Sequence, residues 1–214
     1  MGSDTNHSWE RPRHCVSTSA YDVAIVAVTR REYERFLQDT DRQRPRDWSD
    51  PNFADPNQPV VGVSWFDAMA YCEWISKETG RAFRLPTEAE WERACRGGRE
   101  DTQFPWGDDD PESFEYYRAE WKAPHPVADG SPNGFGLYHM GDNIHEWCLD
   151  WYDPLYYANS PEHDPAGPSS GTRRVSRGGS WRHRVKASRN AHRSSLPPEF
   201  RYTDYGFRLV SSVE

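Results

Sequence analysis

The pattern of hydrophobic and polar positions predicts three helices, each opened by a residue that caps its first turn. The first helix begins after Thr29, the second after Ser64 and the third after Thr87. Glycines end the second and third helices, because a helix commonly stops at a residue with positive φ. These predictions depend on the capping boxes Thr29–Glu32 and Thr87–Glu90, the stop residues Gly80, Gly97 and Gly98, and the apolar stripes Tyr33, Phe36, Leu37 and Trp65, Ala68, Met69, Cys72, Ile75.

Strands are predicted to be short and separated by long irregular segments. Pro, Ser and Gly are frequent in the segment from Asp153 to Arg173, and no clear period runs from Gly98 to Val127, so both are predicted as loops. The predicted strands lie around residues 23–28, 147–151, 174–178 and 206–211.

The composition indicates a folded core built of large aromatic rings. The chain has 214 residues, with 17 Pro, 15 Gly and 10 Trp, and aromatic residues make up 14% of it. Mean hydropathy is low, −1.01, but the aromatic residues are spread evenly, and each buried ring removes a large area from water. We therefore expect one folded domain over residues 1–214.

Charge and cysteine content limit the partners and the compartment. A net charge of −8 argues against a general nucleic-acid surface. We also find no apolar run of membrane-spanning length and no signal peptide, so we expect no nucleic-acid or membrane partner and a cytoplasmic location. Cys15, Cys72, Cys95 and Cys148 fall in no metal-ligand spacing, which favours free thiols in a reducing compartment; Cys72–Cys95 and Cys15–Cys148 bridges stay open as alternatives.

An ordered set of motifs along nearly the whole chain resembles the sulfatase-modifying-factor family, whose best-known members are the formylglycine-generating enzymes. The resemblance implies an α+β protein with a variant C-type lectin fold: short antiparallel sheets, peripheral helices and extensive loops. The motifs are Pro59–Trp65, Arg84–Glu92, Phe104–Gly107, Pro132–Tyr138, Asn143–Trp147, Arg177–Trp181 and Tyr205–Leu209.

The same resemblance implies chemistry that this chain lacks residues to perform. In formylglycine-generating enzymes two cysteines follow the Arg-Gly-Gly-Ser element and hold copper. Here the segment from Arg182 to Ser195 contains no cysteine, His183 aligns with the first of the pair, and the second falls in a gap. Because copper(I) is held by sulfur ligands, we do not expect formylglycine-generating activity.

The family's calcium site is implied by the Asn-Ile-His-Glu-Trp element. Glu146 matches the family's carboxylate ligand and the Ile144 carbonyl a backbone ligand, which suits a cation that takes six to eight oxygens. His139 stands where Asp or Asn is usual, and Asp142 where Gly is usual and could restore an oxygen. The alternative is that Glu146 forms hydrogen bonds within a backbone turn.

Two histidines are candidates for a transition-metal site. By the same resemblance, His145 occupies a Trp position beside the cleft that also receives His183, and His192 or a carboxylate could join them. Two imidazoles and an oxygen form a plausible ligand set for zinc, copper or iron. The alternative is that these histidines are hydrogen-bonding residues of an aromatic loop protein.

The arginine- and aromatic-rich C-terminus is predicted to be the working face. Arginine and aromatic residues are frequent in binding hot spots, whereas Arg177, Arg193 and Arg208 match arginines that tie loops together in the family, so we expect them in buried ion pairs. The most consistent function is a binding module for a protein or peptide ligand, as in the variable proteins of diversity-generating retroelements, which have a similar C-terminal stretch. The alternative is a non-canonical metal-dependent oxidoreductase that uses His145 and His183. The predicted ligand-binding residues are Trp181, Arg182, His183, Arg184, Asn190, His192, Tyr202 and Tyr205.

Overall fold

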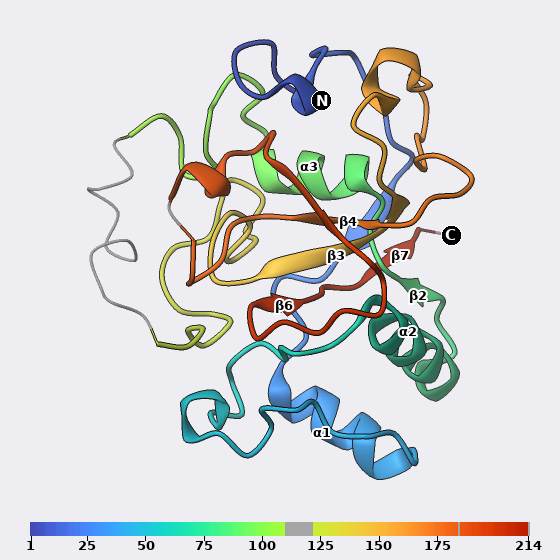
Figure 1. Cartoon of the computed structure of the whole chain (residues 1–214), viewed down its shortest axis with the longest axis vertical. Helices are drawn as coiled ribbons and strands as arrows, with labels where there is room; N and C mark the ends of the chain where they lie inside the picture. Colours follow the sequence, from blue (N-terminus) through green and yellow to red (C-terminus); the bar gives the residue numbers. More distant parts are fainter. Residues whose placement is uncertain (110–121, 184, 214) are drawn as a thin grey trace.

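Two small sheets form the centre of the protein (Figure 1). The computed structural model describes residues 1–109, 122–183 and 185–213. One sheet has the order β1-β7-β2 and is antiparallel. The other has the order β5-β4-β3-β6, in which β6 runs parallel to β3 and the other pairs are antiparallel. The strands are β1 (Tyr21–Val23), β2 (Phe83–Arg84), β3 (His145–Trp151), β4 (Arg174–Arg177), β5 (Arg193–Leu196), β6 (Tyr205–Gly206) and β7 (Val210–Ser212).

The three predicted helices are confirmed, together with the residues that begin and end them. They are α1 (Arg30–Asp39), α2 (Trp65–Thr79) and α3 (Glu88–Arg96). Each is opened by a complete capping box, in which the cap oxygen accepts from the third helical N–H and the acidic side chain accepts from the cap N–H. Gly80 and Gly97 end α2 and α3 with φ of 72° and 57°, which glycine adopts without strain.

The strand predictions are confirmed in part. The expected strands at 147–151 and 174–178 correspond to β3 and β4, but the one at 23–28 is mostly wrong, because only Val23 of that segment lies in a strand, β1. The expected strand at 206–211 is split into β6 and β7, which join different sheets. Sequence reasoning missed β2 and β5, which are short and lack an alternating apolar pattern. Single 3₁₀ turns occupy Ser8–Glu10, Pro51–Phe53, Tyr156–Asn159 and Val185–Ser188.

Strand β3 divides the core into two layers because alternate side chains point to opposite faces. Trp147 joins an aromatic cluster that includes Tyr33, Tyr71 and Phe207, on the side of α1 and α2. Cys148 joins a second cluster with Trp91 of α3. Figure 1 shows α3 on one side of β3 and β4, with α1 and α2 on the other.

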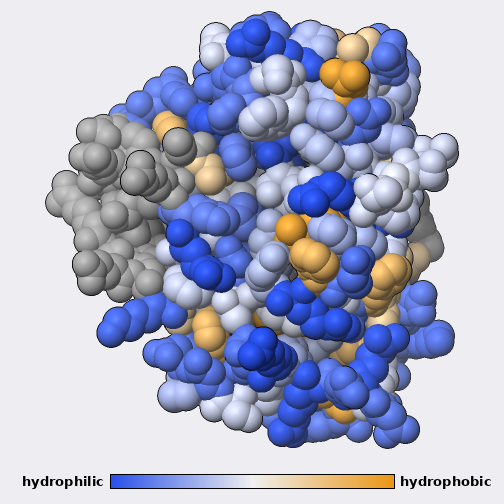
Figure 2. Space-filling model, viewed as in Figure 1, coloured by the Kyte–Doolittle hydropathy of each residue, from blue (hydrophilic) through white to orange (hydrophobic). Residues whose placement is uncertain are grey.

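The face drawn in Figure 2 is mainly hydrophilic, with small groups of hydrophobic residues between the polar ones. Among the described residues, no helix combines the length and apolar character needed to cross a membrane. All four cysteines are free; Cys15 is exposed and the other three are buried.

A buried network of ion pairs joins α3 to strands β4 and β5. Arg177 donates to Glu88 at 2.9 Å and to Glu92 at 2.7 Å, and Arg193 donates to both oxygens of Glu88 at 2.7 and 2.9 Å. Burial alone would raise the pKa of Glu92, but Arg177 and then Arg96 lower it to about 2. The prediction that Arg177 and Arg193 form buried ion pairs is therefore confirmed.

One buried carboxyl group beside this network has a raised pKa, whereas the pKa of Glu92 is lowered. Asp150 on β3 accepts a 2.8 Å hydrogen bond from the backbone N–H of Glu88. Burial, with a contribution from the Glu88 charge, raises the pKa of Asp150 from 3.8 to about 8. Asp150 is thus protonated in the folded protein at neutral pH.

We expect Asp150→Asn to become more stable relative to the wild type as pH rises from about 4 to about 8. In this window the folded Asp150 keeps a proton that the unfolded chain releases, so its contribution to the free energy of unfolding falls as pH rises. Asparagine does not titrate, so the variant lacks this pH-dependent loss of stability. Its side-chain oxygen can still accept the hydrogen bond from the Glu88 N–H. Urea denaturation of both proteins at pH 5 and pH 8 measures the difference, and a difference that is constant or shrinks with pH contradicts the assignment.

Candidate functional site

Three loop segments, residues 141–145, 178–183 and 202–206, meet at one end of the four-stranded sheet. Backbone hydrogen bonds join them: Gly179 N–H to the Gly141 carbonyl at 2.9 Å, Trp181 N–H to the Asn143 carbonyl at 2.9 Å, and His145 N–H to the Asp204 carbonyl at 2.8 Å. The side chains on these segments are therefore positioned by main-chain contacts.

The two glycines of the Arg-Gly-Gly-Ser element allow this approach. Gly178 has a φ of 81°, a conformation that glycine adopts without steric cost. A Cβ atom on Gly179 would lie 2.7 Å from the Ser188 hydroxyl and 2.9 Å from the Gly141 carbonyl oxygen, so any side chain would push the segments apart. Glycine at both positions therefore allows the close packing that brings residues 180–183 to the site.

His145, His183 and Asp204 form a cluster that can hold a metal ion. One ligand atom from each residue lies within 4.8 Å of the other two. The closest contact joins Nε2 of His145 to Nδ1 of His183 at 2.8 Å. His145 and Asp204 are buried, whereas His183 is exposed, so the cluster is reached from one side.

The spacing of the two imidazole nitrogens fits a shared metal. Nitrogens bound to one ion at about 2.0–2.1 Å, with an octahedral or tetrahedral angle between them, lie roughly 2.9–3.4 Å apart. The observed 2.8 Å differs from this range by about a tenth of an ångström. Without metal the same contact is an N–H···N hydrogen bond, so metal binding requires only a small adjustment of the rings.

The surroundings keep His145 neutral. Burial lowers its pKa to about 4; Asp204 opposes this shift and His183 adds to it. A neutral imidazole is the form that ligates metals. The Ser180 hydroxyl donates to Asp204 at 2.9 Å and orients its carboxylate, and the Tyr205 ring lies 4.7 Å from the His145 ring.

Several predicted ligand-binding residues lie around the exposed side of this cluster. Arg182, His183 and Tyr202 are exposed, and Trp181 is partly buried. The Arg182 guanidinium lies 3.8 Å from the Asp204 carboxylate and 5.7 Å from the centre of the Trp181 ring. Arg184 lies outside the described residues. The structure thus brings His145 and His183 together, as expected.

Three of the predicted ligand-binding residues do not lie on this face. Asn190 is buried, donates to the Thr102 carbonyl at 2.9 Å and accepts from the Cys95 thiol, so its prediction as a surface contact is wrong. Tyr205 is also buried, because it packs beneath Tyr202 and against Trp147. His192 is outside the cluster, and burial, followed by the charge of Arg189, lowers its pKa to about 3.

Sequence reasoning missed Asp204 and Ser180. Both lie next to motifs that were recognised, Asp204 directly before Tyr205-Gly206-Phe207 and Ser180 within Arg-Gly-Gly-Ser-Trp. Their position beside His145 follows from the parallel pairing of β6 with β3, which no local pattern indicates.

The predicted calcium ligands have other partners. Arg208 donates to both oxygens of Glu146 at 2.8 Å, and the Trp91 indole donates to one of them at 2.7 Å. Asp142 lies 3.1 Å from Nδ1 of His139. This arrangement does not fit a calcium ion at Glu146 with the Ile144 carbonyl, because a guanidinium already occupies the carboxylate; it confirms the ion pair expected for Arg208.

We expect Glu146→Gln to destabilise the protein by about 3 kcal/mol, because it leaves the Arg208 charge buried without its counter-ion. Urea denaturation measures the effect, and Glu78→Gln on the exposed end of α2 is the control for the loss of one carboxylate.

A calcium ion at Glu146 would give a different pattern. Calcium would then raise the melting temperature of the wild type, EDTA would lower it, and Glu146→Gln would remove both responses. We expect wild-type protein already stripped with EDTA not to respond to added calcium, and a calcium response that is lost in this variant would overturn the ion-pair assignment.

Comparison with solved structures identifies the fold class. The chain superposes on Treponema denticola variable protein 1 with a TM-score of 0.86 and 27% identity, covering 99% of this chain and 91% of that one. This α+β architecture is the variant C-type lectin fold of the formylglycine-generating type, as the sequence predicted.

Sequence comparison identifies the family. Residues 1–213 match the sulfatase-modifying factor enzyme 1-like domain, and the chain belongs to this family. It is 41% identical over 181 residues to the formylglycine-generating enzyme of Streptomyces coelicolor, covering 74% of this chain and 54% of that enzyme. It is also 32% identical over 235 residues to the serine/threonine-protein kinase pkn1 of Chlamydia caviae, covering 100% of this chain and 36% of that protein. The chain therefore spans about half or less of the length of these relatives.

Proposed function

We propose that this chain is a ligand-binding module whose C-terminal face is centred on a divalent transition-metal ion held by His145, His183 and Asp204. The observation that carries this proposal is the 2.8 Å approach of the two imidazoles beside a buried carboxylate. Three protein ligands leave coordination positions open. A donor atom of the bound ligand fills one of them.

The residues around the cluster support a protein or peptide ligand. Trp181, Arg182 and Tyr202 surround the accessible side, and such residues combine a large contact area with directional hydrogen bonds. Tyr202 is 44% exposed and its neighbour Phe200 is 41% exposed, with ring centres 6.0 Å apart. A peptide side chain thus has an aromatic surface to pack against next to the metal.

The second candidate is a metal-dependent oxidoreductase. Two histidines and one carboxylate with open positions are also the ligand set of non-haem iron oxygenases. The 41% identity to a formylglycine-generating enzyme supports an enzymatic role. Oxygen consumption by the iron-loaded protein with candidate peptides, measured against the zinc-loaded protein, separates the two functions.

We expect the wild type to bind one Co²⁺ or Zn²⁺ per chain and His183→Ala to weaken this binding by at least about tenfold. His183 is exposed on a loop, so its removal should leave the fold intact. Isothermal titration calorimetry and the visible spectrum of bound Co²⁺ measure the affinity. His163→Ala, which removes another exposed histidine, should bind as the wild type does; equal affinity of wild type and His183→Ala would refute the site.

We further expect no conversion of a Cys-x-Pro-x-Arg peptide to formylglycine in the presence of copper and oxygen. The segment after Ser180 has no cysteine, and copper(I) is selected by soft sulfur ligands. Mass spectrometry of the peptide measures the conversion. His183→Cys should also be inactive, since it supplies only one of the two sulfurs, and product formed by either protein would contradict this prediction.

A further inference from the structure

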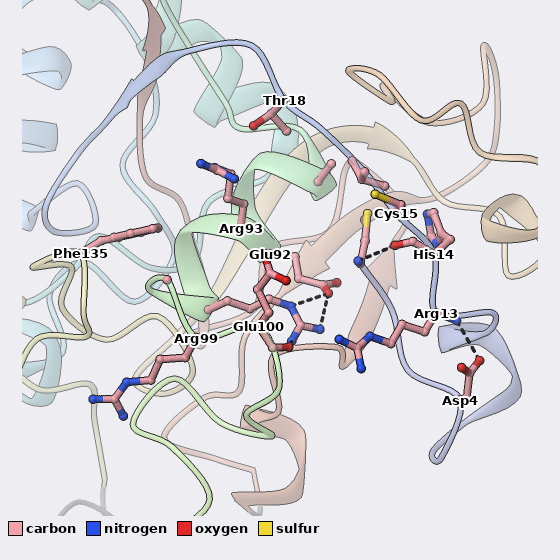
Figure 3. A pocket seen from close by; sticks show the side chains of 15 residues that line it. Asp4, Arg13, His14, Cys15, Thr18, Glu92, Arg93, Arg99, Glu100 and Phe135 are labelled. Carbon is pink, nitrogen blue, oxygen red and sulfur yellow. Dashed lines mark hydrogen bonds and ion pairs between the residues drawn. The ribbon is translucent and has the colours of Figure 1, made fainter.

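A separate cavity of about 480 Å³ lies beside helix α3 (Figure 3). The N-terminal segment, α3, the loop that follows α3 and Phe135 form its walls. Its lining residues do not include His145, His183 or Asp204. Its volume falls within the range of small-molecule sites, about 300–1,000 Å³.

Four arginines line this cavity, in a chain whose net charge is −8. Arg93 and Arg96 come from α3, Arg99 follows the helix, and Arg13 comes from the N-terminal segment. In Figure 3 Arg93 lies beside Phe135, Arg99 points away from Arg93, and Arg13 reaches in from the opposite side. This concentration of guanidinium groups points to an anionic ligand, because arginine binds carboxylate and phosphate through paired hydrogen bonds.

The arginines of the cavity outnumber its carboxylates. The lining contains three acidic residues, Asp4, Glu92 and Glu100. Glu92 is fully buried and shared: Arg96 donates to one oxygen at 2.7 Å and Arg177 to the other, also at 2.7 Å. Two carboxylates, those of Glu88 and Glu92, form ion pairs with three arginines: Arg96, Arg177 and Arg193. The network therefore has one excess positive charge, and Arg96 is its outermost arginine.

Arg93 and Arg99 are available to a ligand. Within the part of the chain that the structure describes, no carboxylate lies within ion-pair distance of either guanidinium. Among the described residues, the Arg99 guanidinium donates to the Trp106 carbonyl alone, at 3.0 Å. Arg13 is paired with Asp101, but that carboxylate is 86% exposed, and such surface pairs contribute little.

The turn after α3 places an aromatic ring at the edge of the cavity. Asn133 donates to the Ala94 and Cys95 carbonyls at the end of the helix and so fixes the loop that carries Phe135. A Cβ atom on Gly98, whose φ is 82°, would lie 3.2 Å from the Phe135 ring. The ring therefore packs where only glycine leaves room, yet it remains 51% exposed and can contact a ligand.

We infer that this cavity binds a small anionic ligand, with its carboxylate or phosphate group on Arg93 and an aromatic or other flat apolar body against Phe135. The site is independent of the metal cluster on the C-terminal face. It gives the protein a second binding function, and no residue of the C-terminal face takes part in it.

The test is isothermal titration of the whole chain with phenyl phosphate, benzoate and inorganic phosphate. We expect the two aromatic anions to bind, and the tighter of the two identifies the preferred head group. Arg93→Gln should weaken that binding by about tenfold or more. Phe135→Ala should weaken the aromatic anions and leave inorganic phosphate unaffected.

A matched control variant distinguishes binding at this cavity from a general effect of removing one positive charge. Arg35→Gln removes the same charge from the exposed face of α1, at the other end of the molecule (Figure 1), and should bind as the wild type does. The inference is overturned if neither aromatic anion binds at millimolar concentration. It is equally overturned if Arg93→Gln reduces binding no more than Arg35→Gln, a result that leaves the metal proposal untouched.

Discussion

The buried pairing of Glu88 and Glu92 with Arg177 and Arg193 is the constraint on which the rest of the structure depends. A charge taken out of water is stable only with a partner, and removal of one partner is strongly destabilising. The carboxylates belong to α3 and the guanidiniums to β4 and β5. The helix can therefore pack on the sheet in only one orientation, a specificity that the aromatic core alone would not provide.

Both candidate sites derive from this network. Arg177 is the last residue of β4, so the loop that carries Ser180 and His183 leaves the sheet from a fixed point. On the other side of the helix, Glu92 of this network holds Arg96 at the wall of the arginine-lined cavity. A substitution in the network would thus disturb two distant surfaces at once, and the exposed residues of each site are better probes of function.

Local signals in the sequence predicted the helices well, because capping boxes and stop glycines act within a few residues. They predicted the strands less well: β5 has little apolar alternation, and the segment after Tyr205 serves two sheets. The meeting of His145 and His183 followed from the family resemblance, whereas Asp204 joins them through a parallel pairing that brings together residues almost 60 positions apart. The errors at Asn190 and Tyr205 have a related cause, since their burial depends on contacts with distant segments.

The division of the C-terminal segment between the two sheets also bears on the order of folding. β7 pairs with β1, near the start of the chain, and β6 pairs with β3 beside the metal cluster. During synthesis β1 can therefore pair with β7 only after residues 210–212 have been made. His145 can likewise meet Asp204 only after residue 204 has been made. Contacts between such distant residues slow folding. Until residues 210–212 have been made, the partly made chain exposes strand edges and aromatic surface, both of which favour aggregation.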